Sequence, residues 1–146
     1  MNGLPFIDTH SVRLKAPPSQ VWPALVAMLR GLGQNHPDPL TRLLGLRPAR
    51  INGEWHETAV EGDSIPGFRA TEVRPCERLV LEGGHRFSRY ALVFALREDG
   101  GGSILEAETW AEFPGLSGAL YRAAVIGTRG HRLAVRRMLG LVARRT

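Results

Sequence analysis

The chain has 146 residues, of which 43% are hydrophobic, and its formal net charge is +5 at pH 7. This length predicts a single domain spanning residues 1–146. No apolar run approaches the roughly 20 residues of a membrane span, and the first residues lack the basic and apolar segments of a signal peptide. The lone cysteine, Cys76, excludes an internal disulfide. We therefore expect a cytoplasmic protein, and pairing of Cys76 with a second chain leaves a homodimer open.

The first third of the chain predicts one strand followed by two helices. Residues 10–16 alternate between apolar and polar side chains, which indicates a strand. Residues 20–32 predict a helix with Ser19 as its N-cap. The glycines and prolines that follow indicate a loop, and residues 40–46 predict a second short helix.

From about residue 50 the apolar pattern has a period of two, which is typical of strands. The predicted strands are residues 51–59, 67–73, 77–87, 88–98 and 103–113. In the clearest strand one face carries Tyr90, Leu92, Phe94 and Leu96. In the last strand one face carries Leu105, Ala107, Thr109 and Ala111, and glutamates occupy the other. The intervening sequence DGGG predicts a hairpin turn.

The C-terminal part returns to a helical period and predicts a long amphipathic helix. Its apolar stripe consists of Leu116, Leu120, Ala124, Gly127, His131, Ala134, Val135, Met138 and Val142. Its opposite face consists of Arg122, Arg129, Arg132 and Arg136. The stripe places His131 toward the core among small residues. Two interior glycines, Gly127 and Gly130, leave a kink or a break into two helices open.

This order of elements predicts an α+β fold, with an antiparallel sheet packed against a C-terminal helix. It resembles the SRPBCC superfamily, the START-like or helix-grip fold of polyketide cyclases, lipid-transfer domains and plant pathogenesis-related allergens. The stretches that carry the resemblance are HSVRLKAPPSQVWPALVAML, GFRATEVRPCERLVLEGGHRFSRYALVFAL and AEFPGLSGALYRAAVIGTRGHRLAVRRML. They cover nearly the whole chain and are similar to a bacterial branch whose members mostly lack an assigned activity.

The resemblance implies a curved sheet wrapped around the long C-terminal helix, two short helices after the first strand, and a cavity between sheet and helix. The residues agree with such a cavity, because the middle of the helix stripe is small. Either bulky strand side chains fill that space or it is a pocket. We interpret it as a pocket for a hydrophobic or amphipathic small molecule, since such sites are apolar with a few orienting polar groups.

The candidate ligand-binding residues are His85, Arg86, Tyr90, Tyr121, Gly127 and His131. Each polar member also has a purely structural interpretation, as a buried side chain with a protein hydrogen-bond partner. If the alternation of the strand continues, His85 faces inward. A bulge would turn Arg86 inward instead, where it would suit a carboxylate or phosphate.

Two further polar residues near the N-terminus are less clearly placed. His10 shares a face with Val12 and Leu14, and we expect a core histidine with a bonded partner. The face of Asp8 is ambiguous. The clearly apolar faces contain no Asp or Glu, so we rank binding above catalysis and name no catalytic residue.

Two alternative functions stay open. The first is a cyclase, dehydratase or isomerase with His131 or His85 as general base, and with Tyr90, Tyr121 or Arg86 polarising a carbonyl. The second is an interaction module that uses the arginine face of the C-terminal helix. No aromatic residues interleave with those arginines, so we expect no nucleic-acid partner. Scattered histidines and the lack of a phosphate-binding loop predict neither metal nor cofactor.

Overall fold

The computed structural model describes residues 3–34, 52–53, 55, 58–85, 88–113, 115, 119 and 130–146, with Gly33, Gln34, His85, Gly130 and His131 described by their backbone alone. The elements follow the chain as β1 (Phe6–Leu14), α1 (Pro18–Gln34), β2 (Ser64–Ile65), β3 (Phe68–Arg74), β4 (Arg78–His85), β5 (Ser88–Asp99), β6 (Gly102–Glu112) and α4 (Gly130–Arg145). The predicted helix at residues 40–46 and most of residues 114–129 lie outside the described residues.

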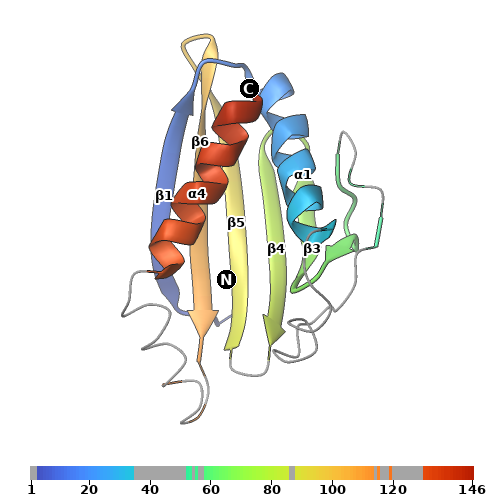
Figure 1. The fold of residues 1–146 in the computed structure, drawn as a ribbon, viewed down its shortest axis with the longest axis vertical. Helices are drawn as coiled ribbons and strands as arrows, with labels where there is room; N and C mark the ends of the chain where they lie inside the picture. Colours follow the sequence, from blue (N-terminus) through green and yellow to red (C-terminus); the bar gives the residue numbers. More distant parts are fainter. Residues whose placement is uncertain are drawn as a thin grey trace.

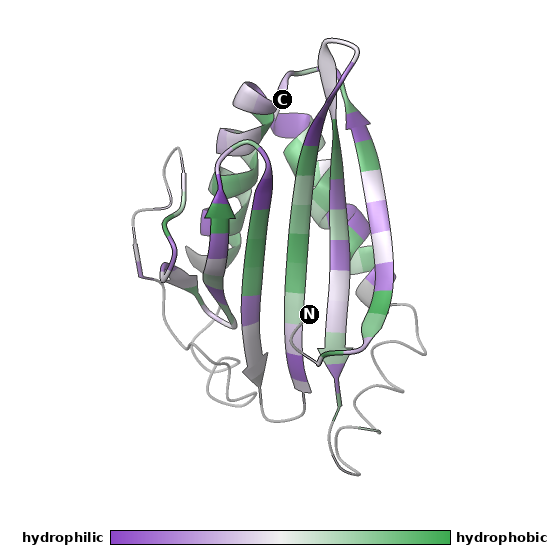
Figure 2. Ribbon diagram, turned by 180° about the vertical axis from the view of Figure 1, so that it is seen from behind, coloured by the Kyte–Doolittle hydropathy of each residue, from purple (hydrophilic) through white to green (hydrophobic). Residues whose placement is uncertain are grey.

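The six strands form one curved, open antiparallel sheet in the order β1-β6-β5-β4-β3-β2. Helices α1 and α4 lie side by side on one face of this sheet (Figure 1). We call this the inner face. In the reverse view, no described helix covers the opposite, outer face (Figure 2). The predicted α+β class and the antiparallel sheet against a C-terminal helix are thus confirmed.

The strands from β3 to β6 form close to where their alternation predicted them. Strand β5 pairs without interruption with both of its neighbours. Arg78 of β4 lies opposite Ala95 of β5, and Asp99 of β5 lies opposite Gly102 of β6. Gly100 and Gly101 make the turn between β5 and β6 with φ values of 54° and 87°. Two consecutive positive φ values match the twist of a hairpin and favour glycine at both positions. The predicted DGGG turn is confirmed.

Strand β1 begins at Phe6, earlier than the predicted residue 10, and contains an irregularity at Ile7. Phe6 lies opposite Trp110, whereas Asp8 lies opposite Thr109, so the register shifts between them. The rings of Phe6 and Trp110 meet edge to face with centroids 5.3 Å apart. A bulge of this kind moves flanking side chains to opposite faces. Phe6 therefore lies on the outer face, and Asp8 lies on the inner face.

Helix α1 begins at Pro18, and the prediction of Ser19 as N-cap was wrong. The carbonyl of Pro17 accepts hydrogen bonds from the backbone N–H groups of Gln20 and Val21, at 3.0 and 3.1 Å. Pro18 occupies the first helical position, where its missing N–H costs little and its fixed φ suits the helix.

The strand predicted at residues 51–59 does not form at the described positions. Asn52 makes only an isolated bridge to Ser64. Gly53 and Trp55 both have positive φ values, 93° and 51°, which are incompatible with an extended chain. Trp55 is fully buried, and its Nε1–H donates to the Asn52 carbonyl at 2.9 Å. Local packing of the indole therefore replaces the ladder that the alternation predicted.

The apolar stripe of α4 is partly as predicted. Val135 and Val142 are buried, as expected, and Met138 is partly buried. Ala134, which was predicted on the stripe, is exposed, whereas Leu139 is buried. Because α4 packs against α1 as well as against β1 and β6, its buried stripe is turned toward Leu139. The exposure predicted for Arg132 and Arg136 is confirmed, and Arg122 and Arg129 lie outside the described residues.

The tight start of β6 gives a first prediction. A Cβ atom on Gly102 would overlap the backbone carbonyl oxygen of Leu14, which cannot move easily, whereas a Cβ on Gly140 of α4 would meet nothing within 4 Å. We expect Gly102→Ala to lower the free energy of unfolding by about 1–3 kcal/mol. We expect Gly140→Ala to raise it by about 0.5–1 kcal/mol. Urea unfolding measures both, and a neutral Gly102→Ala would contradict the close approach.

The orientation of α4 gives a second prediction. Leu139 is buried and Leu133 is 70% exposed, six residues apart on the same helix. We expect Leu139→Ala to cost about 2–5 kcal/mol of stability and Leu133→Ala to change it by about 0.5 kcal/mol or less. Equal effects in urea unfolding would mean that the helix presents a different face to the sheet.

Candidate functional site

The packed apolar core does not extend over the whole inner face of the sheet. Its members on β4, β5 and β6 end at Leu81, Leu92 and Ala107. Beyond them lies the end of the sheet at which β1 and β5 begin and β4 and β6 end. The pairing register places small and polar residues on the inner face there. They are Asp8, His10, Gly83, Tyr90, Thr109 and Ala111, and we call them the inner-face site.

Asp8 and His10 form a pair at the β1 edge of this site. The two residues are two positions apart on one strand, so their side chains lie on the same face. The distance between His10 Nε2 and Asp8 Oδ2 is 3.2 Å, and the side chains are only 14% and 15% exposed. A carboxylate accepts hydrogen bonds, so it orients the imidazole with its Nε2–H toward Asp8. The bonded partner expected for His10 is confirmed.

Thr109 lies beside this pair on β6, directly opposite Asp8. The residue is only 8% exposed, and its Oγ1 has no hydrogen-bond partner in the described part of the chain. A buried hydroxyl without a partner lowers stability, because its hydrogen bonds to water are lost on folding. Such a group is uncommon in folded proteins and calls for an explanation.

Tyr90 borders the site on the β5 side. Its ring packs against Phe68 of β3, with the ring centroids 5.0 Å apart. Tyr90 is paired with Gly83 on β4 and with Ala111 on β6, so its two cross-strand neighbours are small. The lack of a side chain at Gly83 lets the Tyr90 ring reach Phe68 across β4.

Helix α1 leaves the β4 and β5 side of this end of the sheet less covered than the other end. In Figure 1 the lower ends of β4 and β5, which form part of the inner-face site, extend beyond α1. The buried residues of α4, Val135, Leu139 and Val142, belong to the core cluster. The start of α4 lies over β1 at this end of the sheet (Figure 1), so the β1 side of the inner-face site is covered and its β4 and β5 side extends beyond α1.

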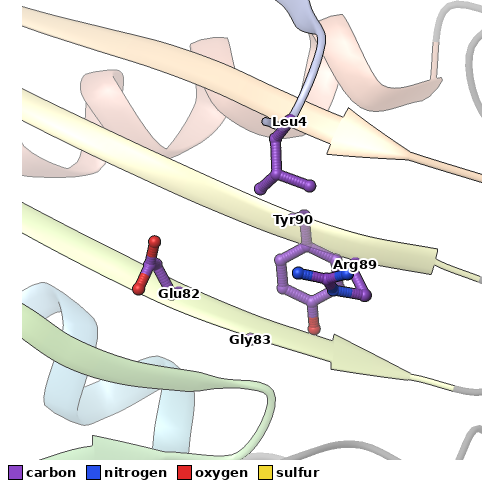
Figure 3. A pocket seen from close by; sticks show the side chains of 5 residues that line it. All are labelled: Leu4, Glu82, Gly83, Arg89 and Tyr90. Carbon is purple, nitrogen blue, oxygen red and sulfur yellow. The ribbon is translucent and has the colours of Figure 1, made fainter. Parts of the chain in front are cut away.

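A separate depression of about 210 Å³ is lined by Leu4, Glu82, Gly83, Arg89 and Tyr90 (Figure 3). Glu82 and Arg89 alternate along their strands with inner-face residues, so their side chains lie on the outer face. Arg89 forms an ion pair with Glu112, at 3.0 Å between Nη1 and Oε1. The two charged residues of the depression thus lie on the face away from the helices, and Gly83 and Tyr90 are shared with the inner-face site.

The structure describes one side chain among the six candidate ligand-binding residues, Tyr90, and places it on the inner face. The backbone of His85 pairs with Ser88, and the β4–β5 ladder reaches this pair without a bulge. The backbone of His131 lies in the first turn of α4. Arg86, Tyr121 and Gly127 lie outside the described residues.

Two residues of the inner-face site were missed by the sequence interpretation. Asp8 was ambiguous because a bulge at Ile7 cannot be read from alternation, although Asp8, His10, Val12 and Leu14 do share one period. Thr109 was assigned to the correct face but was not singled out. Its signal was its polarity, since Leu105, Ala107 and Ala111 on the same face are apolar.

Two further observations concern the described residues alone. They contain no group of three or more His, Cys, Asp or Glu side chains arranged to hold a metal ion. None of the helices described is both long enough and apolar enough to span a membrane.

Thr109 gives a third prediction. If its hydroxyl is buried without a partner, Thr109→Val keeps the shape of the side chain and removes the desolvated group. We expect the free energy of unfolding to rise by about 1 kcal/mol. Chemical denaturation of the two proteins without added ligand measures this. A loss of stability would show that the hydroxyl makes a structural hydrogen bond.

Comparisons with known proteins show similarity in structure alone. No family model matches the sequence, and no curated protein matches it. CalU16 from Micromonospora echinospora is 20% identical over 92% of this chain and 74% of its own, with a TM-score of 0.55. Mll3558 from Rhizobium loti is 19% identical over 95% of both chains, with a TM-score of 0.58. Ara h 8.0201 is 13% identical over 97% of this chain and 96% of its own, with a TM-score of 0.52. These similarities confirm the fold that the resemblance to the SRPBCC superfamily implied.

Proposed function

We propose that this protein binds a hydrophobic or amphipathic small molecule between the inner face of the sheet and the C-terminal helix. The observation that carries this proposal is the change in the amino-acid composition of the inner face along the strands. One end is a packed apolar core, and the other end presents small and polar residues. A pocket of this composition holds an apolar body and orients it through a few polar groups.

The fold supports the proposal without deciding it, since one fold serves many functions. Tyr90 is the proposed lining residue whose side chain is described on the inner face. We retain His85, Arg86, Tyr121, Gly127 and His131 as proposed lining residues on the strength of the sequence. We assign the depression on the outer face no role in this function, because its residue Arg89 already forms an ion pair with Glu112.

An acid–base enzyme is the second candidate, and the Asp8–His10 pair favours it. A histidine oriented by a carboxylate is a common general base. Asp8 supplies a carboxylate on the inner face, beside the imidazole of His10. Binding stays first because one anchored cavity is sufficient for it, whereas catalysis requires a reacting group at a defined position.

A pair of matched variants tests the proposed cavity. Ala111 lies on the inner face and Ala95 on the outer face of the same sheet, opposite Tyr90 and Arg78 respectively. We expect the neutral fluorescent probe N-phenyl-1-naphthylamine to bind the wild-type protein. Ala111→Leu should weaken binding about fivefold or more by filling the space, and Ala95→Leu should leave it unchanged. Fluorescence titration measures binding, and thermal unfolding checks that both variants fold. Equal binding by all three proteins, or no binding to the wild type, would overturn the proposal.

A further inference from the structure

We propose that His10, oriented by Asp8, and Thr109 together recognise a hydroxyl group on an otherwise apolar ligand. This inference rests on the proposed function and adds the chemical class of the ligand. It is carried by two polar groups of the inner-face site whose hydrogen-bonding capacity is not used within the described part of the chain.

The first group is the second ring nitrogen of His10. Nε2 of His10 lies 3.2 Å from Asp8 Oδ2. Because a carboxylate only accepts, the neutral imidazole carries its proton on Nε2, and Nδ1 is left as an acceptor. Within the described residues His10 makes this bond to Asp8 and no other. The carboxylate thus fixes which of the two nitrogens accepts a hydrogen bond from a ligand.

The second group is the hydroxyl of Thr109. It is buried and without a partner in the part of the chain that the structure describes. A hydroxyl both donates and accepts. A protein retains an unsatisfied buried polar group at a cost to its stability, and a function at that position explains why it is kept.

The register brings the two groups to one place. Thr109 lies opposite Asp8, and His10 lies opposite Ala107, so His10 and Thr109 are diagonal neighbours on adjacent strands. Diagonal neighbours on one face have Cβ atoms roughly 7–8 Å apart or slightly less. A ligand oxygen placed between them would be within hydrogen-bonding reach of both.

The chemistry of the two groups selects the ligand. A hydroxyl donates to Nδ1 of His10 and at the same time accepts from the Thr109 hydroxyl. A ketone or ether oxygen only accepts, so it satisfies Thr109 and leaves His10 unused. A carboxylate is repelled by the charge of Asp8. The arrangement therefore favours an alcohol or a phenol.

Two nearly isosteric probes test this selectivity. 2-Naphthol and 2-methylnaphthalene differ by a hydroxyl in place of a methyl group. We expect isothermal titration calorimetry to show that the wild-type protein binds 2-naphthol about 5–10-fold more tightly, which corresponds to one hydrogen bond of roughly 1 kcal/mol. Thr109→Val and His10→Phe should each lower this ratio to about two or less. The affinity for 2-methylnaphthalene should change less than about twofold.

A matched control separates the site from a general effect of the substitution. Thr9 is exposed and lies opposite Glu108 on the outer face, so Thr9→Val makes the same chemical change away from the site. It should leave both affinities unchanged. His10→Phe removes one partner of Asp8 and carries a risk of misfolding. Thr109→Val keeps the shape of the side chain and is sufficient to decide the question alone.

The outcomes distinguish the inference from the function on which it rests. If the wild-type protein binds both probes equally, the hydroxyl site is wrong and the proposed cavity stands. A preference for 2-naphthol that survives unchanged in Thr109→Val also overturns the hydroxyl site. If neither probe binds, the proposed function fails and the inference fails with it.

Discussion

The antiparallel register of β5 with its neighbours β4 and β6 is the constraint on which the rest of the structure depends. Because side chains alternate between the two faces, the register decides which residues meet the helices and which meet solvent. Leu92 and Phe94 therefore lie in the core with Leu81 and Ala107 from the neighbouring strands. A shift by one residue would send this set to the outer face and bring charged side chains inward.

The bulge in β1 extends this constraint to the edge of the sheet. Without it, Phe6 and Asp8 would lie on the same face, since they are two residues apart. The shift at Ile7 lets Phe6 pack on Trp110 outside while Asp8 remains beside His10 inside. One irregular residue thus places an aromatic contact on the outer face and a carboxylate on the inner face. Bulges are known to redirect side chains in this manner near functional sites.

The inner face differs in composition between its two ends. At one end, apolar side chains from the sheet, α1 and α4 are buried against one another. At the other end, polar groups occupy the inner face where the core has apolar side chains, namely the Asp8–His10 pair and the Thr109 hydroxyl. The residues there are also small where the core has large side chains, as at Gly83 and Ala111. Such an exchange lowers the burial of apolar surface, which is the main source of folding free energy. This end of the inner face therefore contributes less to stability than the apolar core does.

The sequence by itself determined the class of fold, the alternation of β3 to β6 and the hairpin at Gly100 and Gly101, because these follow from local periodicity and backbone preference. It also placed Tyr90 and Thr109 on the correct face. It missed the loss of a strand around Trp55, where burial of the indole overrides alternation, and the rotation of α4 that buries Leu139 and exposes Ala134. Only the tertiary structure joined Asp8 and His10 with Thr109, since that proximity depends on a bulge and on pairing between residues about 100 positions apart.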